Sequence, residues 1–200
     1  MYLIGDIGNS EIKICLVNKN NKIVRKVNFS NFNLSLKNLK KNFNKFKNAF
    51  PRIEKILFCS VVPKSFKLIK KFLKTKTKIT CYEVKQLNLS SIIKIKVNFN
   101  QVGSDRITNA ISLMNNKKNF IIVDLGTATT FDVLIKNDFK GGIIAPGIKI
   151  SLRTLSDKAT LIPKINLKKI NSVIGKDTIT AVRSGFFWGY AGLIDNIINL

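Results

Sequence analysis

The chain of 200 residues lacks histidine, has three cysteines and contains no long apolar run. Without histidine, Ser-His-Asp and Cys-His catalysis and imidazole-ligated metals are excluded, which leaves carboxylates as the general bases. Cys15, Cys59 and Cys81 lie in apolar segments without CxxC spacing, so we expect reduced, buried thiols. No run reaches 18 apolar residues, and Asp6 interrupts the place where a signal peptide needs an apolar core. We therefore expect a cytoplasmic protein without a membrane partner.

Acidic residues are scarce, with 11 Asp and Glu against 35 Lys and Arg, and the net charge is +24. Such a charge ordinarily suggests nucleic acid or an anionic membrane as a partner. Here lysine is scattered with Asn and Ile along the whole chain, as between Lys37 and Lys45, which indicates compositional bias. We therefore predict no specific nucleic-acid partner, and only weak, salt-sensitive attraction to nucleic acid.

The most informative segment that is present runs from Phe120 to Asp132. It reads as an apolar strand ending in Asp124, a turn through Gly126 and Thr127, and a second strand. Glycine lets backbone N–H groups approach an anion, threonine hydroxyls donate hydrogen bonds, and the carboxylates of Asp124 and Asp132 suit a cation beside phosphates. The segment thus predicts a phosphate-holding turn. An ordinary hairpin is the alternative.

A second copy of this pattern lies at the N-terminus, between Leu3 and Val17. Asp6 corresponds to Asp124, and Gly8 corresponds to Gly126. Two such copies are typical of duplicated α/β halves that face each other across a cleft. Paired Asp-x-Gly turns resemble the phosphate grip of the acetate-kinase, sugar-kinase, Hsp70 and actin superfamily.

The apolar periodicity predicts the order of the elements. Three strands, 2–7, 11–17 and 22–29, precede a helix with apolar residues from Leu36 to Phe50, with Ser35 as N-cap and Pro51 as its stop. A strand at 55–62, a helix at 65–73 and a strand at 79–84 follow. The second half begins with a helix from Ser104, continues through three strands, and ends in a long helix over 178–200. Gly141-Gly142 and Pro146-Gly147 are predicted turns.

An Asp-Arg pair, Asp105 and Arg106, opens the predicted helix that begins at Ser104. Capping is one interpretation, because aspartate favours the first turn of a helix. The other is chemical: Arg106 would bind a carboxylate through its guanidinium, and Asp105 would accept the proton of a substrate hydroxyl.

Six motifs in order resemble the type III pantothenate kinases: Asp6–Ser10, Ser60–Pro63, Gly103–Arg106, Asp124–Asp132, Gly141–Gly147, and Gly175–Thr178 followed by Ser184-Gly185. The resemblance covers nearly the whole chain. It implies an α/β fold of two duplicated ribonuclease-H-like lobes, as in the actin-like ATPases, facing a nucleotide cleft. We place the lobes at 1–102 and 103–200, with the second lobe shortened at its C-terminus relative to the family.

The resemblance also implies ATP-dependent phosphorylation of pantothenate, the first step of coenzyme A biosynthesis. Asp105 would be the general base, while Gly103, Ser104, Arg106 and Thr178 would bind pantothenate. Mg²⁺, a monovalent cation (K⁺ or NH₄⁺) and a homodimer are implied too, with Asp124 as the metal-side residue. The residues implied for ATP are Asp6, Ile7, Gly8, Asn9, Ser10, Glu11, Ile12, Lys13, Gly126 and Thr127. A plain surface lysine is the alternative for Lys13.

Two alternatives to this function stay open. Lys96 and Phe99 stand where the family usually has a Tyr and a Pro, which keeps a kinase for another small hydroxy acid in view. A non-catalytic protein similar to the Bvg accessory factor, linked to transcription, is the other alternative. The presence of Asp105, Arg106 and both turns favours catalysis.

Overall fold

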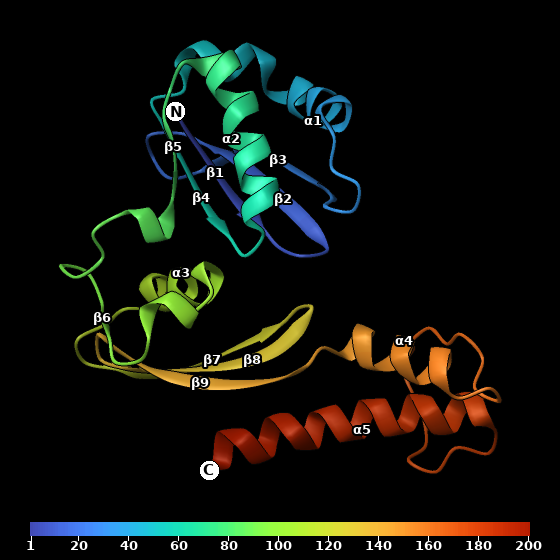
Figure 1. Ribbon diagram of the computed structural model, residues 1–200. Coiled ribbons are helices and arrows are strands. Elements are labelled where there is room, and N and C mark those ends of the chain that lie inside the picture. The colour runs from blue at the N-terminus through green and yellow to red at the C-terminus, as the bar shows by residue number, and fades with distance from the viewer. The chain divides into compact units, whose positions relative to one another are not determined.

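The computed structural model describes all 200 residues and divides into two compact units (Figure 1). The first unit comprises residues 1–119 and 134–141, and the second comprises residues 120–133 and 142–200. Strands β8 and β9 contribute residues to both units. The lobe boundary after residue 102 stays a prediction.

A five-stranded sheet in the order β3-β2-β1-β4-β5 forms the first unit's centre. Strands β1 (Tyr2–Ile7), β2 (Glu11–Val17) and β3 (Ile23–Ser30) are antiparallel neighbours. Strands β4 (Lys55–Ser60) and β5 (Cys81–Glu83) extend the sheet in parallel with β1. This arrangement confirms the ribonuclease-H-like order predicted for the first half, and the strand positions agree closely with those read from the sequence.

The core lies on one face of this sheet. Alternate residues such as Leu3 on β1, Ile14 on β2 and Phe58 on β4 are fully buried and belong to one cluster with the helices. The opposite face carries polar groups, because side chains alternate along each strand. Cys81 lies in the core, whereas Cys15 faces the other side and is only half-buried. The prediction of three buried thiols was therefore wrong for Cys15.

The first helical segment is split. Helix α1 (Leu36–Phe43) has the predicted N-cap, since Ser35 Oγ accepts a hydrogen bond from the Asn38 N–H at 3.3 Å. The chain then tightens into a 3-10 helix, η1 (Asn44–Arg52), which contains Pro51. Phe43, Phe46 and Ala49 are buried at intervals of three, which matches three residues per turn. Pro51 therefore lies within the helical segment, where the sequence predicted its stop.

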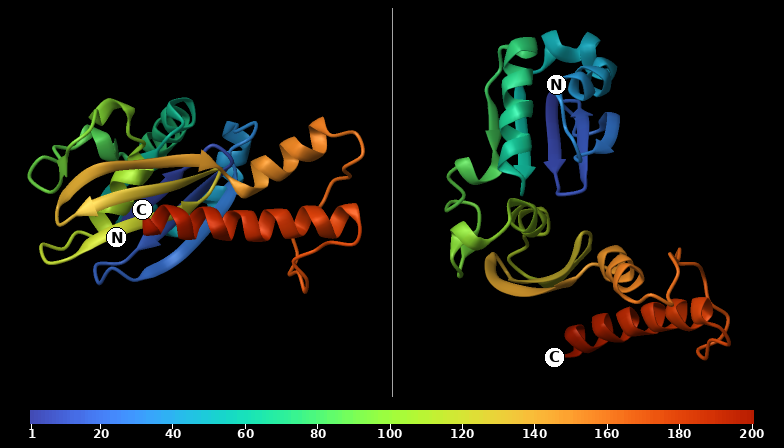
Figure 2. Two further views of the ribbon diagram at one scale, coloured as in Figure 1. Left: turned by 90° about the horizontal axis from the view of Figure 1, so that it is seen from below. Right: turned by 45° about the vertical axis from the view of Figure 1, so that its right-hand side comes forward.

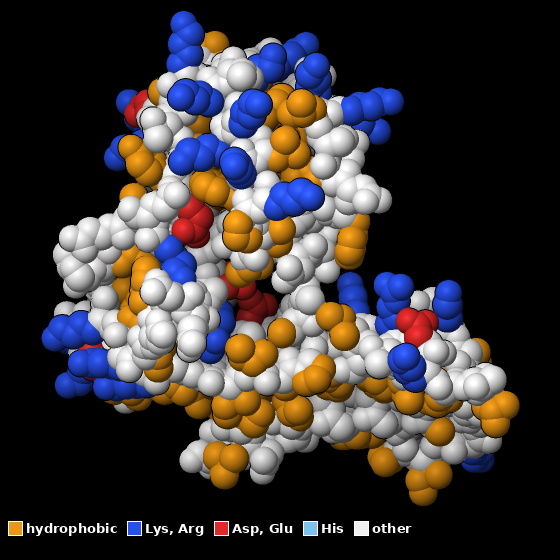
Figure 3. Space-filling model, in the orientation of Figure 1, with side chains coloured by type: hydrophobic (Ala, Val, Ile, Leu, Met, Phe, Trp, Pro, Cys, Tyr) orange, Lys and Arg blue, Asp and Glu red, His pale blue; other side chains and the backbone are white.

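Helix α2 (Pro63–Thr77) is longer than predicted and packs against the same core. The chain then passes through the short elements η2 (Val84–Gln86), β6 (Lys94–Ile95) and η3 (Phe99–Gln101). Helix α3 (Ser104–Ser112) begins at the predicted residue. Lys and Arg side chains cover α1 and α2 with few acidic groups among them, as the scattered lysines predict (Figure 3).

A second sheet has the order β6-β9-β8-β7. Strands β7 (Asn119–Leu125), β8 (Ala128–Ile135) and β9 (Asp138–Pro146) form its consecutive part. Gly141 and Gly142 lie inside β9, and the positive φ of Gly141 (108°) is accommodated within the strand. Of the two predicted turns, only Pro146-Gly147 ends a strand.

Two helices complete the second unit, α4 (Ile148–Lys158) and α5 (Thr178–Asn199). They lie side by side in both views of Figure 2. Asp177 is the N-cap of α5, and its carboxylate accepts a hydrogen bond from the Thr180 N–H at 2.9 Å. None of the helices is long and apolar enough to span a bilayer.

Candidate active site

The N-terminal Asp-x-Gly segment is a tight turn between β1 and β2, as predicted. Strand β1 ends at Ile7 and β2 begins at Glu11, so Gly8, Asn9 and Ser10 form the connection. The Gly8 N–H donates to the Glu11 carbonyl at 3.0 Å and closes the turn. A short, closed turn holds its peptide groups in fixed directions, which is what phosphate binding by backbone N–H groups requires.

Asp6, Lys13 and Cys59 form a row across three adjacent strands, on the sheet face opposite the core. Asp6 pairs in register with Lys13 on β2 and with Cys59 on β4. Lys13 Nζ lies 3.7 Å from Asp6 Oδ2, and Cys59 Sγ lies 3.5 Å from Asp6 Oδ1. The carboxylate of Asp6 is thus held between an ammonium group and a thiol.

Asp105 also lies close to the thiol of Cys59. Burial raises the pKa of Cys59 to about 12, and the negative charges of Asp6 and Asp105 add to the increase. Both carboxylates are therefore close enough to act on the same sulfur atom. The structure brings together the first turn and the Asp-Arg motif, two segments that are distant in the sequence.

The N-terminus of α3 is attached to the end of β4 by a buried hydroxyl. Ser104 is 1% exposed, and its Oγ donates to the Ser60 carbonyl at 3.0 Å and accepts from the Ser60 N–H at 2.7 Å. Both hydrogen bonds go to one backbone residue, so the first turn of α3 is fixed relative to the sheet. Asp105, the next residue, inherits this position.

Asp105 lies in the first turn of α3, after the N-cap residue Gly103. Its Oδ1 accepts the Arg106 N–H at 2.9 Å. A Cβ on Gly103 would lie 2.3 Å from that same oxygen, so a larger residue would displace the carboxylate from this position. Gly103 makes no side-chain cap, and the contact of Asp105 with the helix end is compatible with both the capping and the chemical interpretation.

Arg106, Lys96 and Phe99 each contact a different neighbour within the first unit. The guanidinium carbon of Arg106 lies 5.9 Å from the centroid of the Phe139 ring. Lys96 Nζ lies 3.8 Å from Oδ2 of Asp138, which directly precedes Phe139. Phe99 lies under Lys85, whose Nζ is 4.7 Å from the ring centroid. Both departing side chains are therefore engaged by neighbours within the first unit.

The second Asp-x-Gly segment, in the second unit, is a hairpin turn between β7 and β8. The Gly126 N–H donates to the Ala128 carbonyl at 2.9 Å. A Cβ on Gly147 would lie 2.5 Å from the Gly126 oxygen and 2.3 Å from the Thr127 oxygen. Gly147 is therefore required by the close approach of this turn to the start of α4. The geometry is that of a hairpin, and the phosphate-binding role of this turn stays a prediction.

Thr178 is not brought to this turn. Tyr190 is the α5 residue beside the start of α4, because its hydroxyl donates to the Pro146 carbonyl at 3.1 Å and lies 2.7 Å from Ser151 Oγ. Thr178 lies more than three helical turns before Tyr190, so the two residues are roughly 18 Å apart along α5.

Known proteins share this arrangement of motifs. A family model described as type III pantothenate kinase matches residues 2–200. The chain belongs to this family. It is 61% identical over 207 residues to the type III pantothenate kinase of Pelagibacter ubique, an alignment that covers 100% of this chain and 81% of that relative. It is 36% identical over 152 residues to that of Syntrophotalea carbinolica, covering 75% of this chain and 60% of that relative.

A solved structure described as a Baf family transcriptional activator from Campylobacter jejuni has a TM-score of 0.54 and 21% sequence identity to this chain. The match covers 98% of this chain and 78% of that one. At this identity the likeness shows the fold alone. Together with the two sheets, it confirms the predicted α/β class, and the family model confirms the resemblance read from the motifs.

A carboxylate suited to a cation lies at each of the two turns. Asp6 supplies a carboxylate at the first turn and Asp124 at the second. Mg²⁺ prefers oxygen ligands and is usually held by one or two carboxylates together with substrate phosphates. The residues present therefore fit a cation that is carried in with ATP, and no cluster of three acidic, His or Cys side chains forms a metal cage.

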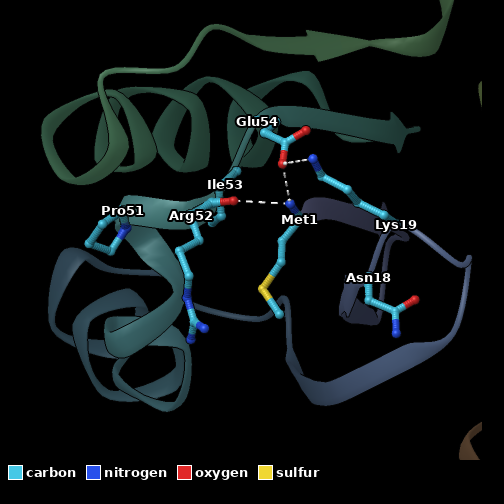
Figure 4. Close-up of a pocket in the computed structure, with 7 residues that line it drawn as sticks. All are labelled: Met1, Asn18, Lys19, Pro51, Arg52, Ile53 and Glu54. Atoms are coloured by element: carbon cyan, nitrogen blue, oxygen red, sulfur yellow. Dashed lines mark hydrogen bonds and ion pairs between the residues drawn. The ribbon is translucent and has the colours of Figure 1, made fainter.

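A pocket of about 490 Å³ lies elsewhere in the first unit (Figure 4). Met1, Arg52 and Glu54 line it, at the amino end of β1, while Asp6 lies at the carboxyl end. Ligands of open α/β sheets bind at the carboxyl ends of parallel strands. The pocket is therefore separate from Asp6 and the first turn.

Sequence reasoning missed Cys59 as a neighbour of the site. Its signal was available: it directly precedes the Ser60–Pro63 motif, on the strand predicted to end beside the first turn. Tyr190 was missed as well, and its role as a link between α5 and Pro146 depends on a tertiary contact that no local pattern shows.

Proposed function

We propose that this chain phosphorylates pantothenate with ATP, giving 4'-phosphopantothenate for coenzyme A biosynthesis. The observation that supports the proposal is that Asp6 and Asp105 both lie close to Cys59, near the end of β4. In the proposal, Asp6 belongs to the phosphate turn and Asp105 accepts the substrate hydroxyl. Membership of the type III pantothenate kinase family supports the same reaction.

In this proposal the hydroxyl oxygen of pantothenate attacks the γ-phosphorus of ATP, and ADP is the leaving group. Asp105 accepts the proton of that hydroxyl. Phosphoryl transfer depends mainly on positioning and on neutralising charge, so the fixed start of α3 is central to the rate. Arg106 binds the pantothenate carboxylate with its planar guanidinium. Gly103 and Ser104 contribute through their backbone, since the Ser104 hydroxyl is occupied by Ser60.

ATP is held by the two turns in this proposal, through the residues from Asp6 to Lys13 and through Gly126 and Thr127. Asp124 would hold a cation, and Mg²⁺ and a monovalent cation, K⁺ or NH₄⁺, would neutralise charge on the phosphates. Lys13 already pairs with Asp6 and would add a positive charge near the phosphates. The protein would act in the cytoplasm as a homodimer, with Thr178 completing the pantothenate pocket at the subunit interface.

The second candidate is a kinase for another small hydroxy acid, which Lys96 and Phe99 favour by replacing the family's Tyr and Pro. A panel of hydroxylated acids, incubated with the protein, ATP and Mg²⁺ and followed by ADP release, separates the two. We expect pantothenate to give the highest kcat/KM. A higher value for a different acid would establish the second candidate, and no ADP release with any acid would refute both.

A further inference from the structure

Asn31, which directly follows β3, donates two hydrogen bonds to the first turn. The Asn31 side-chain amide donates to the Gly8 carbonyl at 2.7 Å, and its backbone N–H donates to the Ser10 carbonyl at 3.0 Å. Two of the three residues that connect β1 to β2, Gly8 and Ser10, are therefore hydrogen-bonded to Asn31. Asn31 is 8% exposed, so water does not compete for these hydrogen bonds.

Asn31 is itself fixed by helix α2. The hydroxyl of Ser65, also 8% exposed, donates to Asn31 Oδ1 at 2.6 Å. Both ends of the Asn31 amide group are thus occupied, the nitrogen by Gly8 and the oxygen by Ser65. A fully satisfied buried network holds one geometry, because any rotation of the amide would leave a polar group without its partner.

The direction of the turn's N–H groups follows from these bonds. The carbonyl of residue 8 and the N–H of Asn9 belong to one planar trans peptide and point in opposite directions. A Gly8 carbonyl drawn towards Asn31 therefore aims the Asn9 N–H away from Asn31. The same argument applies to the Ser10 carbonyl and the Glu11 N–H. An anion that approaches the turn from the side opposite Asn31 meets peptide donors.

We propose that Asn31, oriented by Ser65, is a positioning residue that presets the first turn for the phosphates of ATP. The proposal rests on the proposed function, because it takes the first turn as part of the nucleotide site. Asn31 does not touch the nucleotide and acts through the peptide groups of Gly8 and Ser10. Only the first residue of helix α2 belongs to a kinase motif. Through Ser65 the helix nevertheless helps to fix the geometry of the first turn.

The test compares Asn31→Ala, Ser65→Ala and Ser65→Thr with the wild-type chain. Dissociation constants for ATP and ADP in the presence of Mg²⁺ are measured by calorimetry, together with KM for both substrates and the thermal midpoint. For Asn31→Ala we expect about tenfold weaker nucleotide binding, the size expected from losing a buried hydrogen bond. KM for ATP should rise by the same factor, while KM for pantothenate stays within about twofold. Ser65→Ala should bind nucleotide about threefold more weakly than the wild type. Ser65→Thr keeps the hydroxyl and should bind nucleotide like the wild type.

Matched controls remove the same chemical groups away from the turn. Asn48→Ala changes an exposed asparagine on η1, and Thr77→Ala removes a hydroxyl at the other end of α2, where it donates to the Leu73 carbonyl. Both controls should bind nucleotide like the wild type. The double variant Asn31→Ala/Ser65→Ala should bind no more weakly than Asn31→Ala alone, because the two residues form one unit.

Three outcomes would overturn the proposal: nucleotide binding by Asn31→Ala equal to that of Asn48→Ala, equal losses for ATP and pantothenate, or no recovery in Ser65→Thr. If Asn31→Ala does not fold, Ser65→Ala, which removes a single hydrogen bond, decides the question. A wild-type chain that binds nucleotide without phosphorylating pantothenate refutes the proposed function, and the nucleotide affinities of the variants still test the role of Asn31.

Discussion

The sulfur of Cys59 lies 3.5 Å from Oδ1 of Asp6, and this contact joins two adjacent parallel strands close to the first turn. A protonated thiol donates to a carboxylate, and a thiolate would repel it. Because the pKa of Cys59 is raised to about 12, the thiol stays protonated in the neutral range. Asp6 thereby has a neutral donor at one oxygen and the Lys13 ammonium near the other.

Cys59 should resist alkylation in the folded protein. With a pKa of about 12, its thiolate fraction at pH 8 is on the order of 10⁻⁴, about a thousandfold below that of a free cysteine. Iodoacetamide labelling followed by mass spectrometry should therefore modify Cys59 about a thousandfold more slowly in buffer than in urea. Equal labelling rates in the two conditions would show that the thiol is neither buried nor opposed by the two carboxylates.

Gly147→Ala should damage the second turn. The added Cβ would meet the carbonyl oxygens of Gly126 and Thr127 at 2.5 and 2.3 Å, so the backbone must move. We expect a loss of about 1–3 kcal/mol in unfolding free energy and roughly 10- to 100-fold weaker ATP binding. The matched control is Gly192→Ala, whose Cβ has no atom within 4 Å. Calorimetric ATP affinities that are the same for both variants would contradict the assigned role of the turn.

The ion pair at the N-terminus should make stability depend on acid. The hydrogen bond from the Met1 ammonium lowers the pKa of Glu54 below its ordinary 4.5, and Lys19 adds to this effect. A lowered pKa in the folded state gives stability that is present above pH 4.5 and is lost as the pH falls through the folded value. Glu54→Gln should therefore melt slightly below the wild type at pH 7, and the two curves should converge below pH 4. A difference that persists unchanged at pH 3 would exclude this ion pair as its cause.

The sequence predicted the strands, the two turns and the start of α3 well, because each has a local signature. Alternation fixes β1 and β2, glycine fixes the turns, and Ser104 begins an apolar period of helical spacing. What it did not predict depends on tertiary contacts. The tightening of η1 follows from the packing of Phe46 and Ala49, and the proximity of Asp105 to Cys59 follows from the hydrogen bonds of Ser104 to Ser60.

Helix α5 should form the contact of a homodimer. It has 22 residues, of which only Ser184 is buried, and Phe187 and Trp188 are about half exposed. Hydrophobic side chains appear along its length in Figure 3. Aromatic residues are typical anchors of interfaces. Light scattering should give the mass of two 22.5 kDa chains, and Phe187→Asp should shift it towards one. A fully active monomer at micromolar concentration would refute the dimer.

The central claim is that Asp105 is the hydroxyl acceptor of a pantothenate kinase. The most direct measurement is ADP release from ATP and pantothenate by the wild type and by Asp105→Asn, which keeps the size of the side chain and removes its charge. We predict that turnover falls roughly 10²- to 10⁴-fold, the usual contribution of a general base, while calorimetry shows ATP affinity within about twofold of the wild type. Pantothenate phosphorylation by Asp105→Asn at the wild-type rate would contradict the account and leave Asp105 as a residue that only stabilises the start of α3.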